Sequence, residues 1–452
     1  MRRSWRLLLC SLAALTLTGC VLLGDKLDQF RWHFLTLPIY VFDNSAGYTC
    51  PPQPEVMEHG TNFAVAVSGG GTRSAVFAAG VLEQLAHLPD PRHPGRSLMD
   101  NCDAISGVSG GSLAAAYYSL FKPNDFSSEE EMCAFFQRFK SNMTVDFEFR
   151  GVAHYLTAPW EAVAKYYSRY RFVQTLGNAF DQHIFQGSDF DHLLERELRG
   201  EAPVTILNAT SLDTGQKFLF TNLNVQQSFT VNPMQLIGSL PSIAPKSDQS
   251  ALTALAQIAS TPIFTPFGFD AINSDIGRFK IAHAVAASSA YPLIPGPAAL
   301  QNYATPGYVH LADGGVNDNS GVDSIVGLYL GHLQQASAAK RLVVVSINVG
   351  APLKEKKSGN PDGYVSSVEY IDRAATALGT RAQTFATVMY NAPQSIKVIN
   401  VSLPDATCSE SLDSTLATLA ISERDMLTVL TAAQELVQKN SPQILGALTA
   451  AR

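Results

Sequence analysis

The sequence predicts an α/β fold in which a largely parallel central sheet is covered by helices on both faces. Short apolar runs such as Phe63–Val67 alternate along the chain with longer helical patterns. Strands separated by helices favour parallel pairing, since the helix carries the chain back across the sheet. The 452 residues are 46% hydrophobic, which excludes general disorder and supplies a large core.

The expected elements follow one another from residue 63 to residue 437. Strands are expected at residues 63–67, 104–108, 204–208, 217–221, 309–312, 342–349 and 395–401. Helices are expected at residues 74–88, 112–121, 282–290, 322–333, 368–390 and 412–437. Two helical insertions, at about 122–200 and 225–275, interrupt this pattern.

The first insertion is rich in aromatic residues, and two interpretations of it stay open. Its large side chains include Trp160, Tyr166, Tyr167, Tyr170 and Phe172. They can extend the core or form a helical cap. Alternatively, they form a lid or a membrane-facing surface, because Trp and Tyr favour the bilayer interface.

The N-terminal segment has the pattern of an export signal. Three arginines precede an apolar run, Leu7–Leu17, that is too short to cross a bilayer. The run ends in Leu17–Cys20, a stretch that resembles the lipobox of bacterial lipoproteins. The resemblance implies that residues 1–19 are removed, that Cys20 is acylated and that residues 20–60 form a tether. The protein is then expected as a membrane-anchored lipoprotein of the bacterial cell envelope, periplasmic or at the outer membrane. An ordinary signal peptide that contains a Cys is the alternative.

Charge and cysteine usage exclude two classes of partner. The net charge of −7 and the lack of a basic run argue against nucleic acid. No Cys-x-x-Cys pair occurs, so we expect no zinc site. We also expect no other metal and no cofactor. In an exported chain, the remaining cysteines predict one or two disulfides of unknown pairing. These are Cys50, Cys102, Cys133 and Cys408.

A nucleophile pattern, G-x-S-x-G, occurs at Gly107–Gly111. The chemistry needs a sharp turn from strand to helix, where small neighbours let the serine side chain project. The strand expected before Ser109 and the apolar helix expected after it supply that context. Ser109 is therefore the candidate nucleophile.

Three consecutive glycines, Gly69, Gly70 and Gly71, follow the first strand and precede a helix. Such a run is costly in backbone entropy unless its freedom is used. Its N–H groups can converge on an anion, helped by the positive end of the helix. A phosphate loop would require a Lys-Ser/Thr ending that is absent here. An oxyanion hole for acyl transfer fits the pattern better.

The serine needs a proton acceptor, and histidine is poorly placed for that role. The last of the ten histidines is His332, inside an expected helix. Asp313 stands at the end of an expected strand and is followed by Gly314 and Gly315. Parallel-sheet proteins place functional groups at such strand ends. Asp313 is therefore the candidate base.

Together, these motifs resemble the patatin-like phospholipase family and the catalytic part of cytosolic phospholipase A2. The glycine run continues as Thr72-Arg73, and the serine and Asp-Gly-Gly motifs follow it in family order. Residues 286–292, Ala-Ala-Ser-Ser-Ala-Tyr-Pro, and Asn208–Thr210 with Thr214-Gly215 are similar to further family blocks. The sequence has Ser320-Gly321 where the family often has Pro, which affects the loop more than the active pair.

The resemblance implies a three-layer catalytic domain over residues 61–350 and a Ser109–Asp313 dyad without histidine. Gly69, Gly70 and Gly71 would hold the oxyanion, and Arg73 would position the glycine loop or an anionic head group. The expected reaction is hydrolysis of lipid esters, phospholipids or lysophospholipids, without a metal. Residues 351–452 are expected as an extension packed on the core, and the sequence says nothing about the oligomeric state. A carboxylesterase, thioesterase or acyltransferase with the same dyad, or a non-catalytic lipoprotein interaction module, is the alternative.

Overall fold

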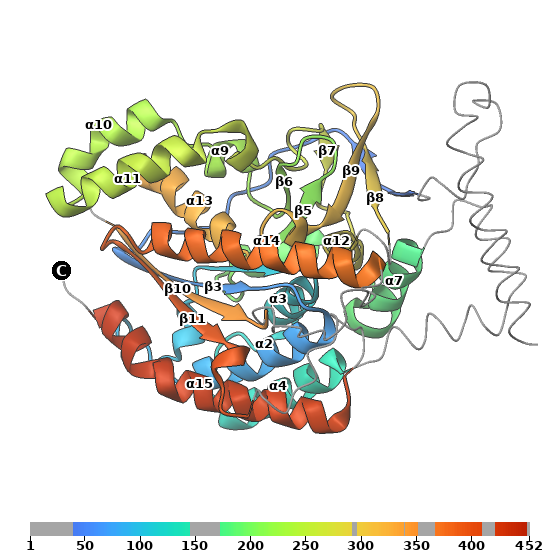
Figure 1. Ribbon diagram of the computed structural model, residues 1–452, viewed down its shortest axis with the longest axis horizontal. Helices are drawn as coiled ribbons and strands as arrows, with labels where there is room; N and C mark the ends of the chain where they lie inside the picture. The colour runs from blue at the N-terminus through green and yellow to red at the C-terminus, as the bar shows by residue number, and fades with distance from the viewer. Residues whose placement is uncertain are drawn as a thin grey trace, which may run out of the picture. The chain divides into compact units, whose positions relative to one another are not determined.

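A single mixed sheet lies at the centre of the protein (Figure 1). The structure is a computed structural model and describes residues 39–144, 172–291, 296–338, 340–350, 367–408 and 421–449. Within these residues, nine strands form the sheet: β1 (Tyr40–Phe42), β3 (Thr61–Val67), β4 (Ala104–Val108), β5 (Val204–Ser211), β6 (Lys217–Phe220), β8 (Ala298–Gln301), β9 (Tyr308–Asp313), β10 (Arg341–Asn348) and β11 (Ile396–Ser402). A separate antiparallel pair joins β2 (Ser45–Ala46) to β7 (Ser274–Asp275).

The middle of the sheet is parallel, as predicted. Its strand order is β1-β8-β9-β5-β4-β3-β10-β11, and β6 pairs with β5. Strands β5, β4, β3, β10 and β11 all pair in parallel, whereas β9 runs antiparallel to β5 and β8. Val67 of β3 pairs with Gly107 of β4 and with Ile347 of β10, so the strands end together. The loops that follow these strands therefore meet at one edge of the sheet.

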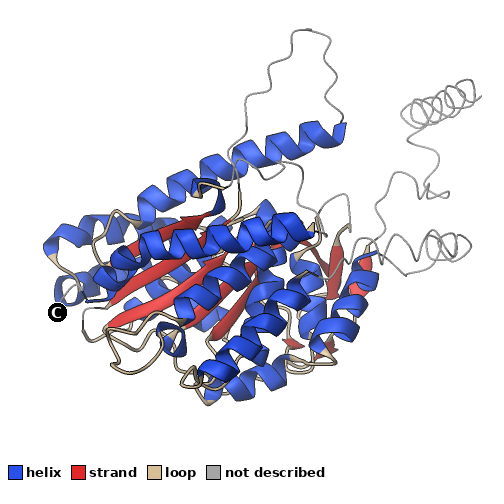
Figure 2. Cartoon of the chain, turned by 90° about the horizontal axis from the view of Figure 1, so that it is seen from below, coloured by secondary structure: helices blue, strands red, loops and turns tan. Residues whose placement is uncertain are grey.

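Helices cover both faces of the sheet (Figure 2). The residues of the strands alternate between the two layers. In β3, Phe63, Val65 and Val67 join one buried cluster, whereas Ala64 and Ala66 join the other. The first cluster includes residues of α2 (Gly71–Ala86), α3 (Gly110–Phe121), α4 (Glu129–Met143), α7 (Phe172–Phe180), α8 (Phe190–Leu198), α12 (Ile281–Ser288) and α15 (Glu423–Thr449). The second includes residues of α9 (Val225–Phe229), α10 (Pro233–Ile243), α11 (Lys246–Ala259) and α13 (Val322–Leu333), with the end of α14 (Ser367–Tyr390). Burial on both faces explains why these strands are apolar throughout.

Short helical turns complete the described elements. They are η1 (Leu98–Asn101), η2 (Asp181–Phe185), η3 (Pro262–Phe264), η4 (Gly314–Val316) and η5 (Leu403–Asp405). None of the described helices is both long and apolar enough to cross a membrane.

The two predicted insertions contribute to the covering layers. In α4, Phe135, Phe136 and Phe139 are buried in the first cluster, so this part of the aromatic stretch is core. Leu236 of α10 and Leu252 of α11 are buried in the second. Trp160, Tyr166, Tyr167 and Tyr170 lie outside the described residues, as does the side chain of Phe172.

Both ends of the described chain belong to the sheet or to its covering. The expected tether includes β1, which pairs with β8 at the sheet edge. The C-terminal extension contributes β11, which pairs with β10, and α15, whose Ala433 and Leu436 are buried. At Gly80 of α2, an added Cβ would lie 2.9 Å from the Ala433 Cβ, so these helices pack closely. The expected signal peptide and Cys20 lie outside the described residues.

The expectation of one or two disulfides is wrong for this structure. Cys50, Cys102 and Cys133 are free thiols. Cys102 is buried beside β4, whereas Cys50 and Cys133 are exposed on a loop and on α4. The Cys408 thiol lies 3.6 Å from the Thr428 carbonyl. The even number of cysteines in the sequence is thus not matched by pairing in the structure.

Candidate active site

The predicted site residues gather where the parallel strands end. We call Ser68–Gly71, after β3, the glycine turn; Gly107–Gly111, after β4, the elbow; and Asp313–Ser320, after β9, the acid loop. At Gly69, an added Cβ would lie 3.4 Å from the Ser109 Cβ, so the glycine turn is beside the serine. The Ser109 side chain lies close enough to Asp313 to lower the pKa of its carboxyl group. Three segments distant in the sequence therefore meet at one place.

Ser109 has the strained backbone of a sharp turn between strand and helix. Its φ of 53° and ψ of −123° are unusual for a residue other than glycine. The residue is half-buried and caps α3, so its side chain lies at the positive end of that helix. The Ser109 N–H donates to the Ser288 hydroxyl over 2.9 Å. This bond holds the backbone of the turn from outside the elbow.

The glycines of the elbow allow backbone to approach backbone. At Gly110, an added Cβ would lie 2.0 Å from the carbonyl oxygen of Gly71. At Gly111, it would lie 2.4 Å from the carbonyl oxygen of Val67. Any larger residue would push the elbow away from the glycine turn. The N-termini of α2 and α3 consequently converge beside Ser109.

Asp313 ends β9 and is buried, with 6% of its surface exposed. Burial raises the pKa of its carboxyl group to about 6, although hydrogen bonds from the Gly315 N–H and the Ser109 hydroxyl act in the opposite direction. The Gly315 N–H donates to Asp313 Oδ1 over 2.7 Å. This carboxylate is therefore ionised at neutral pH yet more basic than an ordinary aspartate.

The glycine turn differs in one respect from the prediction. The Gly69 N–H donates to the Asn319 carbonyl over 3.0 Å, so it is already used by the fold. Gly70 and Gly71 have φ values of 147° and 61° and begin α2. N–H groups at a helix start have no acceptor within the helix. Gly70 and Gly71, rather than Gly69, are thus the donors suited to an oxyanion.

Arg73 lies in the first turn of the same helix and is half-buried. Its position near the start of α2 puts a cationic residue close to the glycine turn. The sequence predicts a role for Arg73 in positioning the glycine loop or a head group, and the fold places this residue at the edge of the sheet where the parallel strands end.

Polar residues without a predicted role hold the site together. The Ser288 hydroxyl, fully buried, donates to the Asn208 carbonyl over 2.5 Å and pairs with Ser112 over 2.7 Å. The Asn208 amide donates to the Gly107 carbonyl over 2.7 Å. The Thr210 hydroxyl donates to the Asp313 carbonyl over 2.9 Å. Their only signal in the sequence is the family blocks around residues 208–210 and 286–292.

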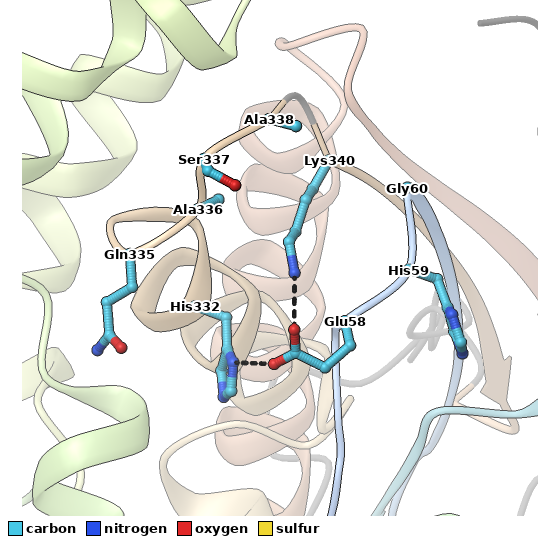
Figure 3. A pocket seen from close by; sticks show the side chains of 9 residues that line it. All are labelled: Glu58, His59, Gly60, His332, Gln335, Ala336, Ser337, Ala338 and Lys340. Carbon is cyan, nitrogen blue, oxygen red and sulfur yellow. Dashed lines mark ion pairs between the residues drawn. The ribbon is translucent and has the colours of Figure 1, made fainter.

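His332 lies in α13, in the helix expected for it, and at the other edge of the sheet from Ser109. A pocket of about 330 Å³ there is lined by residues that precede β3 and β10, together with the end of α13 (Figure 3). His332 Nδ1 lies 3.8 Å from Glu58 Oε1, and Lys340 Nζ lies 3.5 Å from Glu58 Oε2. The Glu58 carboxylate and the Lys340 ammonium group form an ion pair, whereas burial lowers the pKa of His332. The pocket is therefore distinct from the Ser109 site, at the carboxyl ends of the strands. Among the described residues, no group of three or more His, Cys, Asp or Glu side chains is placed to hold a metal.

Comparison with known families agrees with this geometry. The sequence model of the patatin-like phospholipase family matches residues 65–326, which contain the glycine turn, the elbow and the acid loop. The chain belongs to the patatin-like phospholipase family. This is a family of lipid acyl hydrolases, and its fold has the mostly parallel sheet and flanking helices seen here.

Solved structures similar to this patatin-like chain include human GIVD cytosolic phospholipase A2, with a TM-score of 0.44 and 13% identity over 86% of this chain and 62% of that chain. The same enzyme in complex with methyl gamma-linolenyl fluorophosphonate gives a TM-score of 0.42 and 13% identity over 86% and 59%. VipD from Legionella pneumophila gives 0.32 and 10% identity over 93% and 73%. The chain thus spans about three fifths of the length of the cytosolic phospholipase A2 chains. No curated protein matches the sequence.

Gly110→Ala tests the close approach of the two helix starts. The added methyl group would overlap the Gly71 carbonyl oxygen, and we expect a loss of unfolding free energy on the order of 4 kcal/mol or more. The matched control is Gly446→Ala in α15, where an added Cβ meets nothing within 4 Å. That change should be neutral or stabilising by up to about 1 kcal/mol. Urea unfolding measures both, and equal stability of the two variants would contradict the packing described.

Asp313→Asn should stabilise the protein above neutral pH. The carboxyl group has a pKa of about 6 in the folded protein against a usual value of 3.8. The unfolded chain ionises first, so the free energy of unfolding falls as the pH rises from about 4 to about 6. At pH 8, removing the charge should restore up to about 3 kcal/mol. Urea unfolding at pH 4 and pH 8 measures this gain, with the exposed Asp405→Asn as control. A variant less stable than the native protein at pH 8 would contradict the buried charge.

Proposed function

We propose that this protein is a serine acyl hydrolase that cleaves ester bonds of phospholipids or lysophospholipids through an acyl-enzyme on Ser109. The observation that carries the proposal is the meeting of the Ser109 side chain with the buried Asp313 carboxyl group, whose pKa Ser109 lowers, beside the glycine turn. Family membership supports the substrate class, because the matched family consists of lipid acyl hydrolases. The geometry of the site supports ester hydrolysis and the family supports a lipid, so a lipid ester is the substrate that agrees with both.

In the first step, Ser109 Oγ attacks the ester carbonyl carbon while its proton passes to the Asp313 carboxylate. The carbonyl oxygen becomes an oxyanion, for which the N–H groups of Gly70 and Gly71 are the proposed donors. One such donor typically lowers the barrier by about 3 to 4 kcal/mol. The intermediate collapses, the C–O bond to the leaving alcohol breaks, and the alcohol takes the proton from Asp313. An acyl group remains on Ser109.

In the second step, water replaces the alcohol. Asp313 accepts a proton from the water as its oxygen attacks the acyl carbon, and the returned proton restores the Ser109 hydroxyl. The product is a free fatty acid. Because the acyl-enzyme is the same for any acceptor, a thiol ester substrate or an alcohol acceptor would use the same two residues. The assay therefore has to compare substrates.

Arg73 is the proposed contact for the anionic head group, or else a residue that positions the glycine turn. It is cationic and lies in the first turn of α2, after Gly71. A guanidinium group matches phosphate oxygens in two-pronged geometry. The proposal is compatible with the described fold because Arg73 is half-buried and not enclosed in the core.

Ser109→Ala should abolish labelling by a fluorophosphonate probe and release of fatty acid from phospholipid and lysophospholipid. The exposed Ser242→Ala is the matched control and should behave as the native protein.

Asp313→Asn should lower turnover by at least about 100-fold, because general base catalysis contributes roughly that factor or more. The native kcat/KM should rise through about pH 6 and then level off, since the base must be ionised.

The contrary outcomes are equally specific. Native turnover by Asp313→Asn would exclude the dyad and revive a histidine base. Labelling of Ser109 with turnover only on short-chain or thiol esters would exclude the lipid substrate while keeping the acyl-enzyme.

We also propose that Cys20 anchors the protein in the bacterial cell envelope. The support is the lipobox-like stretch that ends at Cys20. Attachment through two or more acyl chains would hold the enzyme at a membrane, whereas one chain binds only weakly. Mass spectrometry of the N-terminal peptide should find acyl groups on native Cys20 and none in Cys20→Ser. An unmodified native peptide would refute the anchor.

A further inference from the structure

A buried cluster of charges lies directly behind the acid loop. Lys217, the first residue of β6, has a side chain that is 6% exposed. Its Nζ lies 3.1 Å from Asp318 Oδ2 and 3.1 Å from Asp323 Oδ2. Asp318 belongs to the acid loop and Asp323 to the first turn of α13. The Tyr390 hydroxyl, at the end of α14, donates to Asp323 Oδ1 over 2.6 Å. One ammonium group thus joins three elements around the loop, and Tyr390 adds a fourth.

The charges of this cluster depend on one another. Burial lowers the pKa of Lys217, but Asp318 and Asp323 outweigh burial and leave the pKa above its usual value. A buried carboxylate without a cation costs several kcal/mol, so two of them side by side require the ammonium group. The lysine is therefore charged, and its position is fixed by two acids on different elements.

Asp318 connects the fixed Lys217 ammonium group to the residues around Asp313. Its N–H donates to the Gly314 carbonyl over 3.0 Å, which ties it to the residue after Asp313. The next residue, Asn319, accepts the Gly69 N–H over 3.0 Å. An added Cβ at Gly69 or Gly315 would lie 2.3 or 2.7 Å from Asn319 Oδ1, so this side chain is wedged between the glycine turn and the acid loop. The distance between the glycine turn and the acid loop therefore depends on the positions of residues 318 and 319.

We propose that Lys217 is a positioning residue of the active site: by fixing Asp318, it sets the acid loop, and with it Asp313, against the glycine turn. Lys217 does not touch the reacting atoms in this arrangement. It acts through Asp318 and Asn319, and through the start of α13. The inference rests on the function proposed above, because the geometry it controls is that of the Ser109 reaction.

The test compares Lys217→Met with a matched ion-pair variant. Lys280→Met removes a lysine that pairs with Asp181 and whose side chain is 43% exposed, outside the three active-site segments. Fluorophosphonate labelling rate, kcat, KM and the pH midpoint of labelling are measured on the folded fraction of each, as given by urea unfolding. We expect Lys217→Met to lower kcat and the labelling rate at least about 10-fold with KM little changed, and to move the pH midpoint, because Asp313 is displaced. Lys280→Met should change none of these.

Two further variants keep the test decisive. Lys217→Met/Asp323→Asn removes one acid together with the lysine, so the formal charge of the cluster stays that of the native protein. This double variant should fold more stably than Lys217→Met and still label slowly, since Asp318 has lost its cation. Lys217→Arg keeps the charge and should recover part of the labelling rate.

The outcomes separate the two proposals. If native protein is not labelled at Ser109, the proposed function fails. If native protein is labelled, and folded Lys217→Met and the double variant label at the native rate and pH midpoint, then Lys217 serves stability alone and the inference is overturned.

Discussion

The site depends on the buried carboxylate of Asp313. No cationic group is among the causes that set its pKa. Burial, the Gly315 N–H and the Ser109 hydroxyl together put the pKa of Asp313 at about 6. Two other acids of the protein with little exposed side chain have cationic partners: Arg92 lies 3.0 Å from Asp90, and Lys217 lies 3.1 Å from Asp318. A lysine beside Asp313 would stabilise the fold but would hold the carboxylate ionised and make it a weaker base. The burial that lowers the stability of the fold therefore also gives Asp313 the basicity that the Ser109 reaction requires.

Close backbone approach is what brings this carboxylate, the serine and the amide donors together. The starts of α2 and α3 can meet only because Gly110 has no side chain to strike the Gly71 carbonyl. Gly314 likewise lies where a Cβ would be 2.4 Å from the Asn208 carbonyl. Each glycine thus marks a contact between two segments, and the contacts converge on Ser109. Two helix starts at one point add their positive dipoles, which favours the negative charge of an oxyanion.

The sequence predicts the residues at the strand ends better than the residues that support them. Ser109, Asp313 and the glycine turn are readable because turns, strand ends and glycine runs leave local patterns. The family block at residues 286–292 contains Ser288 but does not reveal its role, since its bonds to Ser109 and Asn208 depend on how α12 packs against β4 and β5. The involvement of Gly69 with Asn319 was also unreadable, because the two residues are 250 positions apart in the sequence and meet only through the sheet order. The prediction of disulfides is wrong for the same reason: the number of cysteines carries no information about the distances between them in the fold.

The two edges of the sheet show why chemistry is confined to one of them. At the amino ends of β3 and β10, the Glu58 carboxylate pairs with the Lys340 ammonium group, so the pocket there has little charge left to offer a ligand. At the carboxyl ends, the helices begin, and their first N–H groups face the loops with no partner inside the helix. A buried base, a strained serine and amide donors can coexist at that edge because α2 and α3 start there. The parallel order of β10, β3 and β4 is thus a condition of the site, since reversing one of these strands would carry its loop to the opposite edge.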